Sequence, residues 1–238
     1  MAASSFPLIL CLETSTKVCS VALGQNGKLL ALKESLDEKY SHSENLTLYI
    51  EDVCRQAAVS LQEIDAVAIS KGPGSYTGLR IGVSAAKGLC YALNKPLIAV
   101  NTLEAMAAGQ ISNLKSKVSN LYCPMLDARR MEVYCAVYDE NMKVVFPTSA
   151  IIVDENFISK VLYSQSSILN SQFIFFGDGA EKCKEKIAQP NARFVGNIFP
   201  SAQHLIPLAE KNFSEKKFED LAYFEPFYLK DFVSGSAK

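Results

Sequence analysis

Two segments of the chain carry residues of the kind that hold phosphate groups. Residues 71–82 read K-G-P-G-S-Y-T-G-L-R-I-G, which places Gly72, Gly74, Ser75 and Thr77 between a strand-like run and a helix-like run. Backbone N–H groups at such a helix start point outward, and the helix dipole favours a negative charge there. The glycines are also consistent with a tight turn that binds nothing. The segment matches neither G-x-x-x-x-G-K-[ST] nor G-x-G-x-x-G, so both interpretations stay open.

The second polar segment interrupts the first apolar run with Glu13, Thr14 and Ser15, and Asp127 interrupts a similar run in the second half of the chain. Each acidic residue stands at the tip of an expected hairpin. Glu13 and Asp127 could form a carboxylate pair for acid–base chemistry, but a duplication alone would also leave one acidic residue at each tip. We assign these four residues, with the glycine segment, to a vestigial nucleotide site.

The residues needed for metal-dependent or nucleophilic hydrolysis are not grouped in this sequence. His42 and His204 are the only histidines, and neither has a second histidine at H-x-x-x-H spacing. The serine of Gly74-Ser75-Tyr76 lacks the second glycine of G-x-S-x-G and has no histidine placed to activate it. Seven cysteines without a C-x-x-C pair predict free thiols rather than zinc ligands or disulfides. We expect no metal site and no catalytic residue.

The elements expected around these segments occur twice. Each copy begins with a three-stranded meander, predicted at residues 8–12, 18–23 and 28–32 and again at 121–126, 131–138 and 143–146. Each meander is followed by a helix, a strand, a glycine turn and another helix. In the first copy the helix, the strand and the second helix are predicted at residues 43–58, 64–70 and 79–93, and in the second copy at residues 155–163, 173–176 and 180–187. Such a duplication predicts two α/β lobes with a cleft between them, the plan of the actin-like and Hsp70 ATPase folds.

We expect the first lobe to span residues 1–105 and the second to span residues 106–212. A last strand at residues 97–100 would close the first lobe, and a helix that begins near Thr102 would cross to the second. A helix at residues 202–212 would precede the aromatic-rich tail. We expect the tail, residues 213–238, to pack back on the first lobe.

The composition is that of a globular protein. Of the 238 residues, 49% are hydrophobic, which supports a full core, and the net charge is −1. The 24 basic residues are spread along the chain, so the charge does not indicate tight direct binding of nucleic acid. No apolar stretch reaches the roughly 18 residues of a membrane helix, and residues 8–12 are too short for the core of a signal peptide. We expect a cytoplasmic protein without membrane contact.

With these elements placed, the chain resembles the TsaB (YeaZ) family almost end to end. The matching motifs are ILCLETST from residue 9, CSVAL from 19, HS from 42, GPGSYTGLRIG from 72, AKGL from 86, MLDAR from 125, EVY from 132 and EPFYL from 225. The long glycine segment is the most specific of them. Glu13 departs from the pattern, which usually has aspartate there, and the tail after Tyr228 is short.

The resemblance implies a duplicated fold of the actin-like, ribonuclease H-like (ASKHA) class. It also implies a role in forming N6-threonylcarbamoyladenosine at position 37 of tRNAs that read ANN codons. In that family the chain is a non-catalytic relative of TsaD, the metal-bearing subunit with which it pairs, and an ATPase, TsaE, completes the complex. Relatives were formerly grouped with glycoproteases as peptidase M22.

The same resemblance implies a homodimer when TsaD is absent, contact with tRNA only through the complex, and no firm cofactor. We expect ATP or ADP to bind in the complex and only weakly to the isolated chain. The alternatives are a stand-alone ATPase or kinase of the actin-like fold, and a peptidase. Robust turnover of ATP by the pure chain would favour the kinase or ATPase.

The two helices at residues 43–58 and 79–93 are candidates for a partner surface. In the first, Leu48 and Glu51 lie off the apolar stripe that suits the core. In the second, small residues recur at every fourth position, namely Gly78, Gly82, Ala86 and Cys90. Such a stripe lets another helix approach closely, although it could equally lie on the protein's own sheet. The resemblance implies that these helices bundle with the same pair in TsaD.

Overall fold

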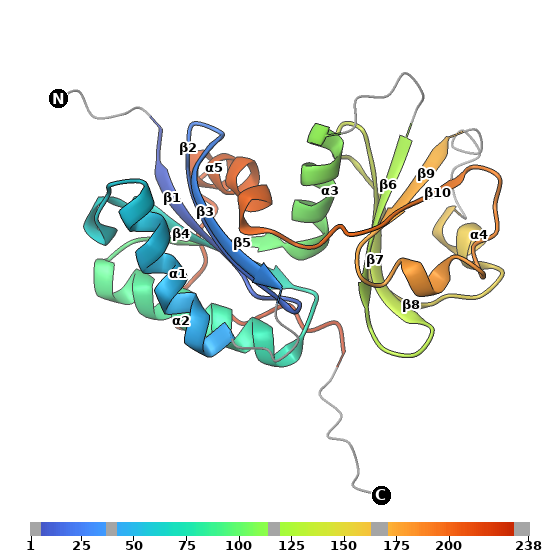
Figure 1. Ribbon diagram of the computed structural model, residues 1–238, viewed down its shortest axis with the longest axis horizontal. Helices are drawn as coiled ribbons and strands as arrows, with labels where there is room; N and C mark the ends of the chain where they lie inside the picture. Colours follow the sequence, from blue (N-terminus) through green and yellow to red (C-terminus); the bar gives the residue numbers. More distant parts are fainter. Residues whose placement is uncertain (1–5, 37–41, 114–119, 163–170, 231–238) are drawn as a thin grey trace, which may run out of the picture.

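The computed structural model describes residues 6–36, 42–113, 120–162 and 171–230, which form two lobes side by side (Figure 1). The first lobe contains a five-stranded sheet of β1 (Leu8–Glu13), β2 (Val18–Gln25), β3 (Lys28–Leu36), β4 (Ala66–Gly72) and β5 (Leu97–Asn101). The second contains β6 (Asn120–Asp127), β7 (Glu132–Asp139), β8 (Val144–Ile152), β9 (Gln172–Phe176) and β10 (Ala192–Val195).

The two sheets have the same connectivity. Their strand orders are β3-β2-β1-β4-β5 and β10-β9-β6-β7-β8, which are the same order read from opposite edges. In the first, β1 pairs antiparallel with β2 and parallel with β4, and β6 pairs in the same way with β7 and β9 in the second. The sequence repeat is therefore a structural duplication.

Helices cover both faces of the first sheet. One face carries α1 (His42–Gln56) and α2 (Tyr76–Leu93), and the other carries α5 (Ile206–Ser214) with the 3₁₀ helix Ala202–Leu205 (Figure 1). Consecutive residues of β1 serve the two cores, because Leu10 packs toward α1 and α2 while Cys11 packs toward α5. A strand covered on both faces has no polar side, which explains the unbroken apolar run that begins at Leu8.

The helix α3 (Thr102–Asn113) connects the two lobes and lies between them (Figure 1). Its Ala105 packs in the core of the first sheet, whereas Met106 and Ala107 pack against Tyr122 and Phe176 of the second. Because one short helix contributes to both cores, the relative position of the lobes depends on its packing.

The division of the chain at residue 212 does not follow this packing. Residues 106–212 were predicted to form the second lobe, but three of them, Ala202, Leu205 and Ala209, are buried against Ile9 and Cys11 of the first sheet. The chain thus returns to the first lobe about ten residues before the expected boundary. Further along, the tail contacts the same lobe through a hydrogen bond from the N–H of Glu219 to the O of Leu97, 2.9 Å long.

Two expectations for the second lobe differ from the structure. The helix predicted at residues 180–187 is only a 3₁₀ turn, Glu181–Cys183, followed by further turns. The edge strand β10 was not predicted, because its four residues are only partly buried and show no clean alternation. The weak helix predicted near residues 155–163 is the short α4 (Phe157–Leu162), and residue 163 lies outside the described ranges. Within those ranges, none of the helices combines the length and apolar character needed to cross a membrane.

Candidate functional site

A cavity of about 440 Å³ lies between the two lobes. The first lobe contributes the turn between β1 and β2 and the glycine segment, through Ser15, Thr16, Lys17, Gly74, Ser75, Tyr76 and Thr77. The second contributes Leu126, Asp127, Ala128, Arg129, Tyr134 and Asp178, and residues 227–230 of the tail complete the lining. The cavity therefore unites most of the segments that the sequence assigned to a nucleotide site.

The glycine segment is bonded to the turn that follows β1. The N–H of Ser75 donates to the O of Ser15 at 2.6 Å, and the hydroxyl of Thr14 donates to the O of Gly78 at 2.9 Å. A Cβ added at Gly74 would lie 2.2 Å from the O of Ser15, and one added at Gly78 would lie 2.1 Å from the O of Thr14. These glycines are thus required for the contact between two loops of the same lobe.

The two predicted carboxylates lie in different environments. Glu13 is fully buried, and its Oε1 accepts the N–H of Ser15 at 2.6 Å. Its Oε2 has no hydrogen-bond partner within the described chain, and burial raises the pKa of this carboxyl group. Asp127 is exposed and paired with Lys182. Since only Asp127 lines the cavity, the structure does not present the two groups as a matched acid–base pair.

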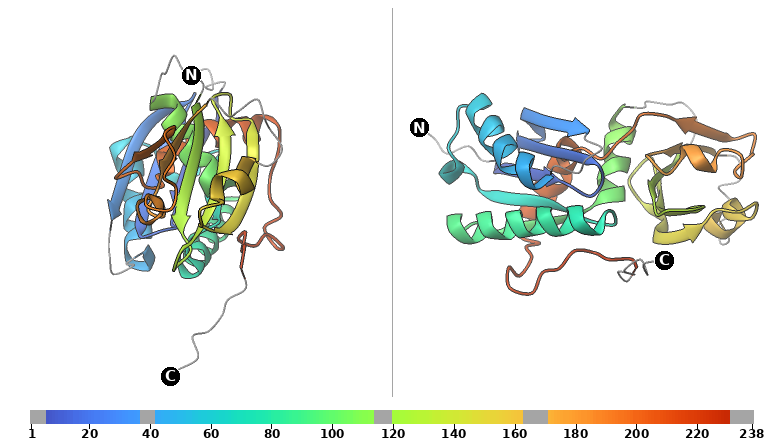
Figure 2. Two further views of the ribbon diagram at one scale, coloured as in Figure 1. Left: turned by 90° about the vertical axis from the view of Figure 1, so that its right-hand side faces the viewer. Right: turned by 60° about the horizontal axis from the view of Figure 1, so that its bottom comes forward.

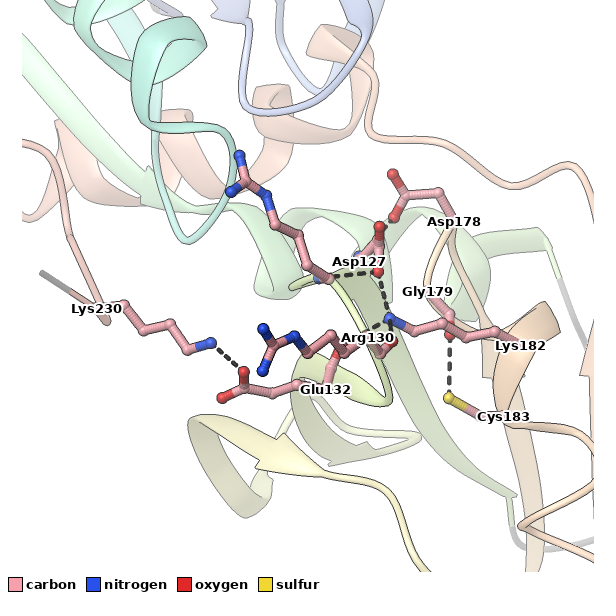
Figure 3. Close-up of polar contacts among 9 residues, drawn as sticks. Asp127, Arg130, Glu132, Asp178, Gly179, Lys182, Cys183 and Lys230 are labelled. Carbon is pink, nitrogen blue, oxygen red and sulfur yellow. Dashed lines mark hydrogen bonds and ion pairs between the residues drawn. The ribbon is translucent and has the colours of Figure 1, made fainter. Parts of the chain in front are cut away.

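Lys182 organises the turn of the second lobe that borders the cavity (Figure 3). Its Nζ contacts the carboxylate of Asp127 and donates to the O of Arg130 at 2.6 Å and the O of Glu132 at 2.8 Å. The N–H of Asp127 in turn donates to Oδ1 of Asp178 at 3.0 Å, and burial raises the pKa of Asp178. One ammonium group therefore holds both sides of the turn.

Lys182 and Asp178 are site residues that the sequence did not predict. Asp178 stands between Gly177 and Gly179, and that glycine turn was its only signal. Lys182 is 55 positions from Asp127 along the chain, and a single lysine in a polar segment carries no pattern that reveals such a partner.

Cationic and aromatic side chains dominate the rest of the cavity wall. Lys17 and Arg129 supply positive charge, Lys230 is paired with Glu132, and four aromatic rings line the same space, those of Tyr76, Tyr134, Phe227 and Tyr228. Arg129 has a φ of 70°, in the left-handed region that residues other than glycine rarely adopt. This wall suits a planar ligand that carries negative charge.

The thiols and histidines do not form a reactive centre in the described chain. All seven cysteines are free and buried, and burial raises the pKa of Cys19 and of Cys90 to about 11, which disfavours the nucleophilic thiolate. His42 is buried with its Nε2 2.7 Å from the O of Thr16. Among the described residues, no three His, Cys, Asp or Glu side chains are grouped to hold a metal ion.

The small-residue stripe of α2 faces the protein's own sheet. All four of its members, Gly78, Gly82, Ala86 and Cys90, are buried. A Cβ added at Gly82 would lie 2.2 Å from Oγ1 of Thr14 on the turn after β1 and 3.0 Å from Cδ1 of Ile69 on β4. The interpretation of these four residues as a partner surface is therefore corrected. Leu48 and Glu51 of α1 are exposed, and their role stays a prediction.

The duplicated sheets and the cavity between them define a two-lobed α/β protein of the actin-like ATPase fold. A family model described as "TsaD: tRNA N6-adenosine threonylcarbamoyltransferase" matches residues 34–234. The chain belongs to the TsaB (YeaZ) family, which is related to TsaD.

Several relatives match over nearly their whole length. The chain is 32% identical to the tRNA threonylcarbamoyladenosine biosynthesis protein TsaB of Buchnera aphidicola subsp. Baizongia pistaciae, over 94% of this chain and 98% of the relative. It is 29% identical to TsaB of Escherichia coli strain K12, over 95% of this chain and 96% of the relative. A solved structure of YeaZ from Pseudomonas aeruginosa superimposes with a TM-score of 0.78 at 25% identity, over 94% of this chain and all of that chain.

Proposed function

We propose that this chain is a subunit of the machinery that forms N6-threonylcarbamoyladenosine at position 37 of ANN-decoding tRNAs, and that it supports a TsaD-type subunit without transferring the group itself. The observation that carries the proposal is the match to proteins named for this biosynthesis, which extends over 94–95% of the chain. Burial raises the pKa of the Cys19 and Cys90 thiols, which disfavours a cysteine nucleophile and supports a non-catalytic role. A stand-alone ATPase or kinase is the less favoured alternative.

The partner surface that we propose is the outer side of α1 and α2, which lie side by side on the first lobe (Figure 1). Leu48 on α1 is 56% exposed and Tyr91 on α2 is 86% exposed, unusual values for large side chains with apolar area. Two further positions of α2 are open: Ser84 is exposed, and a Cβ added at Gly88 would meet no atom within 4 Å. Exposed apolar groups beside small residues suit close approach of helices from a TsaD-type subunit, or from a second copy of this chain when that subunit is absent.

The remaining partners follow from the same proposal. A TsaE-type ATPase would complete the complex, and tRNA would be met through the complex in the cytoplasm. The net charge of −1 supports indirect rather than direct contact with RNA.

The function is tested by reconstituting tRNA modification from purified TsaD-type and TsaE-type subunits, with and without this chain. We expect modification to depend on the chain. If the reaction proceeds equally well without it, the proposed function is wrong.

The surface is tested in the same assay with Leu48→Arg and Gly88→Arg. We expect both variants to fold and to lose co-purification with the TsaD-type subunit. Val144→Arg is the matched control, because Val144 is 53% exposed but lies on β8 of the second lobe, away from the proposed surface. Retained binding in both helix variants, or equal loss in the control, contradicts the assigned surface.

We also propose that the cavity between the lobes binds ATP or ADP weakly in the isolated chain. The cationic and aromatic wall supports binding of a nucleotide. Two backbone donors of the glycine segment are already bonded, which disfavours tight binding. The N–H of Ser75 donates to the O of Ser15, and the N–H of Gly78 donates to the hydroxyl oxygen of Ser75. These groups are therefore not free to bind phosphate. Calorimetry with ATP and ADP checks this, and micromolar affinity in the isolated chain overturns it.

A further inference from the structure

The tail of the chain runs along the first lobe beside α2 and toward the second lobe (Figures 1 and 2). Along α2, the ammonium group of Lys87 donates to the O of Phe224 at 3.1 Å and lies 3.4 Å from the O of Ala222. Beyond this point, the N–H of Phe227 donates to the O of Lys71 at 2.7 Å. The next residues, through 230, line the cavity itself.

This last segment, residues 227–230, is attached to both lobes. Its Tyr228 ring lies 4.9 Å, centroid to centroid, from the ring of Tyr76 at the start of α2 in the first lobe. Two residues later, the ammonium group of Lys230 pairs with the carboxylate of Glu132 at the start of β7 in the second lobe (Figure 3). The segment therefore joins the two lobes along one side of the cavity.

The first lobe has a backbone that accommodates the segment. Gly72, at the end of β4, has a φ of 110°, a conformation that side chains rarely tolerate. A Cβ added at this position would lie 2.9 Å from the O of Phe227. Gly72, the first glycine of the glycine-rich segment, therefore leaves space for the tail. This role explains the glycine without a phosphate ligand.

We propose that residues 227–230 form a strap that partly covers the cavity between the lobes, and that release of the tail opens the cavity further. Among the described residues, the contacts that hold the strap include a backbone hydrogen bond, an aromatic contact and a partly exposed ion pair. Contacts of these kinds are individually weak, so the closed state is reversible. A ligand that occupies the part of the cavity lined by the strap must displace it. The inference does not depend on which ligand enters or on the proposed function.

The test is the labelling rate of a single reactive cysteine inside the cavity of the full-length protein. The seven native thiols are buried, so the background reaction with a thiol reagent is slow. Ala128→Cys places a reporter on the cavity wall. Ser84→Cys on the exposed side of α2 is the control reporter, because Ser84 does not line the cavity.

Each reporter is combined with Glu132→Lys, which replaces the attraction to Lys230 with repulsion, and with Tyr228→Ala. We expect each change to increase the labelling rate at position 128 by about threefold or more, the scale of one weak contact, and to leave the rate at position 84 unchanged. Adding Lys230→Glu to Glu132→Lys restores the ion pair in reverse and should restore slow labelling. Circular dichroism and the melting temperature establish that each variant is folded.

Equal labelling rates at position 128 in all folded variants overturn the strap. Failure of the reversed pair to restore slow labelling also contradicts it, since the link between Lys230 and the second lobe would then not hold the cavity closed. An equal rise at both reporters indicates general loosening of the fold and counts against the proposal.

Discussion

The backbone N–H of Ser75 donates a 2.6 Å hydrogen bond to the carbonyl oxygen of Ser15. This contact joins the glycine-rich segment to the turn after β1, the two loops that the sequence suggests as opposite sides of a phosphate site. The loops approach so closely that a side chain at Gly74 or Gly78 would overlap the backbone of Ser15 or Thr14. The two loops of the expected phosphate site are therefore in direct contact with each other.

Gly82 is expected to be intolerant of even one methyl group. In Gly82→Ala the new Cβ would lie 2.2 Å from Oγ1 of Thr14, and overpacking of a core of this kind costs about 1–3 kcal/mol. Gly88→Ala is the matched control on the same helix, because a Cβ there meets open space. It should stabilise by roughly 0.5–1 kcal/mol through helix propensity. Urea unfolding of the three proteins gives the comparison.

Thr14→Ala identifies the cause of the predicted loss at Gly82. It removes the Oγ1 atom that the new methyl group would meet, so Gly82→Ala should cost less in the Thr14→Ala background than in the native protein. Equal costs in both backgrounds would show that Thr14 is not the obstacle. A stable Gly82→Ala variant would contradict the inward orientation of the stripe.

The buried Glu13 should make the protein less stable as the pH rises from mildly acidic values. Burial raises the pKa of Glu13 in the folded state, whereas in the unfolded chain it stays near the ordinary value of about 4.3. Between these two pKa values the unfolded chain has lost a proton that the folded chain keeps. The free energy of unfolding therefore falls with rising pH, by at most about 1.4 kcal/mol per pH unit, and levels off above the raised pKa.

Urea unfolding of the native protein and of Glu13→Gln over a series of pH values measures this effect. The glutamine carries no titrating proton, so this part of the pH dependence is absent from Glu13→Gln. As the pH rises, the native protein should therefore lose stability relative to the variant. Glu63→Gln is a control of opposite sign, since hydrogen bonds from Ser60 lower the pKa of Glu63 and its contribution is lost as the pH falls. Parallel curves for the native protein and Glu13→Gln would disprove the raised pKa.

We expect the loss of the Lys182 ammonium group to lower the free energy of unfolding, because this group holds the turn beside the cavity. Lys182→Met removes the donor shared by the carbonyl groups of Arg130 and Glu132 and should cost about 1–2 kcal/mol. Lys184→Met is the control, because the side chain of Lys184 forms an exposed ion pair with Glu181, worth about 0–1 kcal/mol. Thermal or urea unfolding distinguishes them, and equal losses would mean that Lys182 does not hold the turn.

Much of the fold follows from local patterns in the sequence. The apolar runs and turn residues predict nine of the ten strands, since each lies in a stretch with a clear period or a glycine or asparagine turn beside it. The edge strand β10 lacks such a pattern. The repeat of the meander predicts the two-lobed duplication, and the motif from Gly72 to Gly82 indicates the family.

Only the tertiary structure decided which faces and which distant residues meet. The spacing of Gly78 and Gly82 predicts a small-residue face on a helix, but a period does not say whether that face meets a partner or the protein's own strand; the position of Thr14 decides it. Likewise, the contacts of Lys182 with Asp127 and of Lys230 with Glu132 join residues 55 and 98 positions apart. Local sequence specifies the conformation of each segment, whereas such contacts arise only when separate segments pack together and their charges and volumes are matched in space.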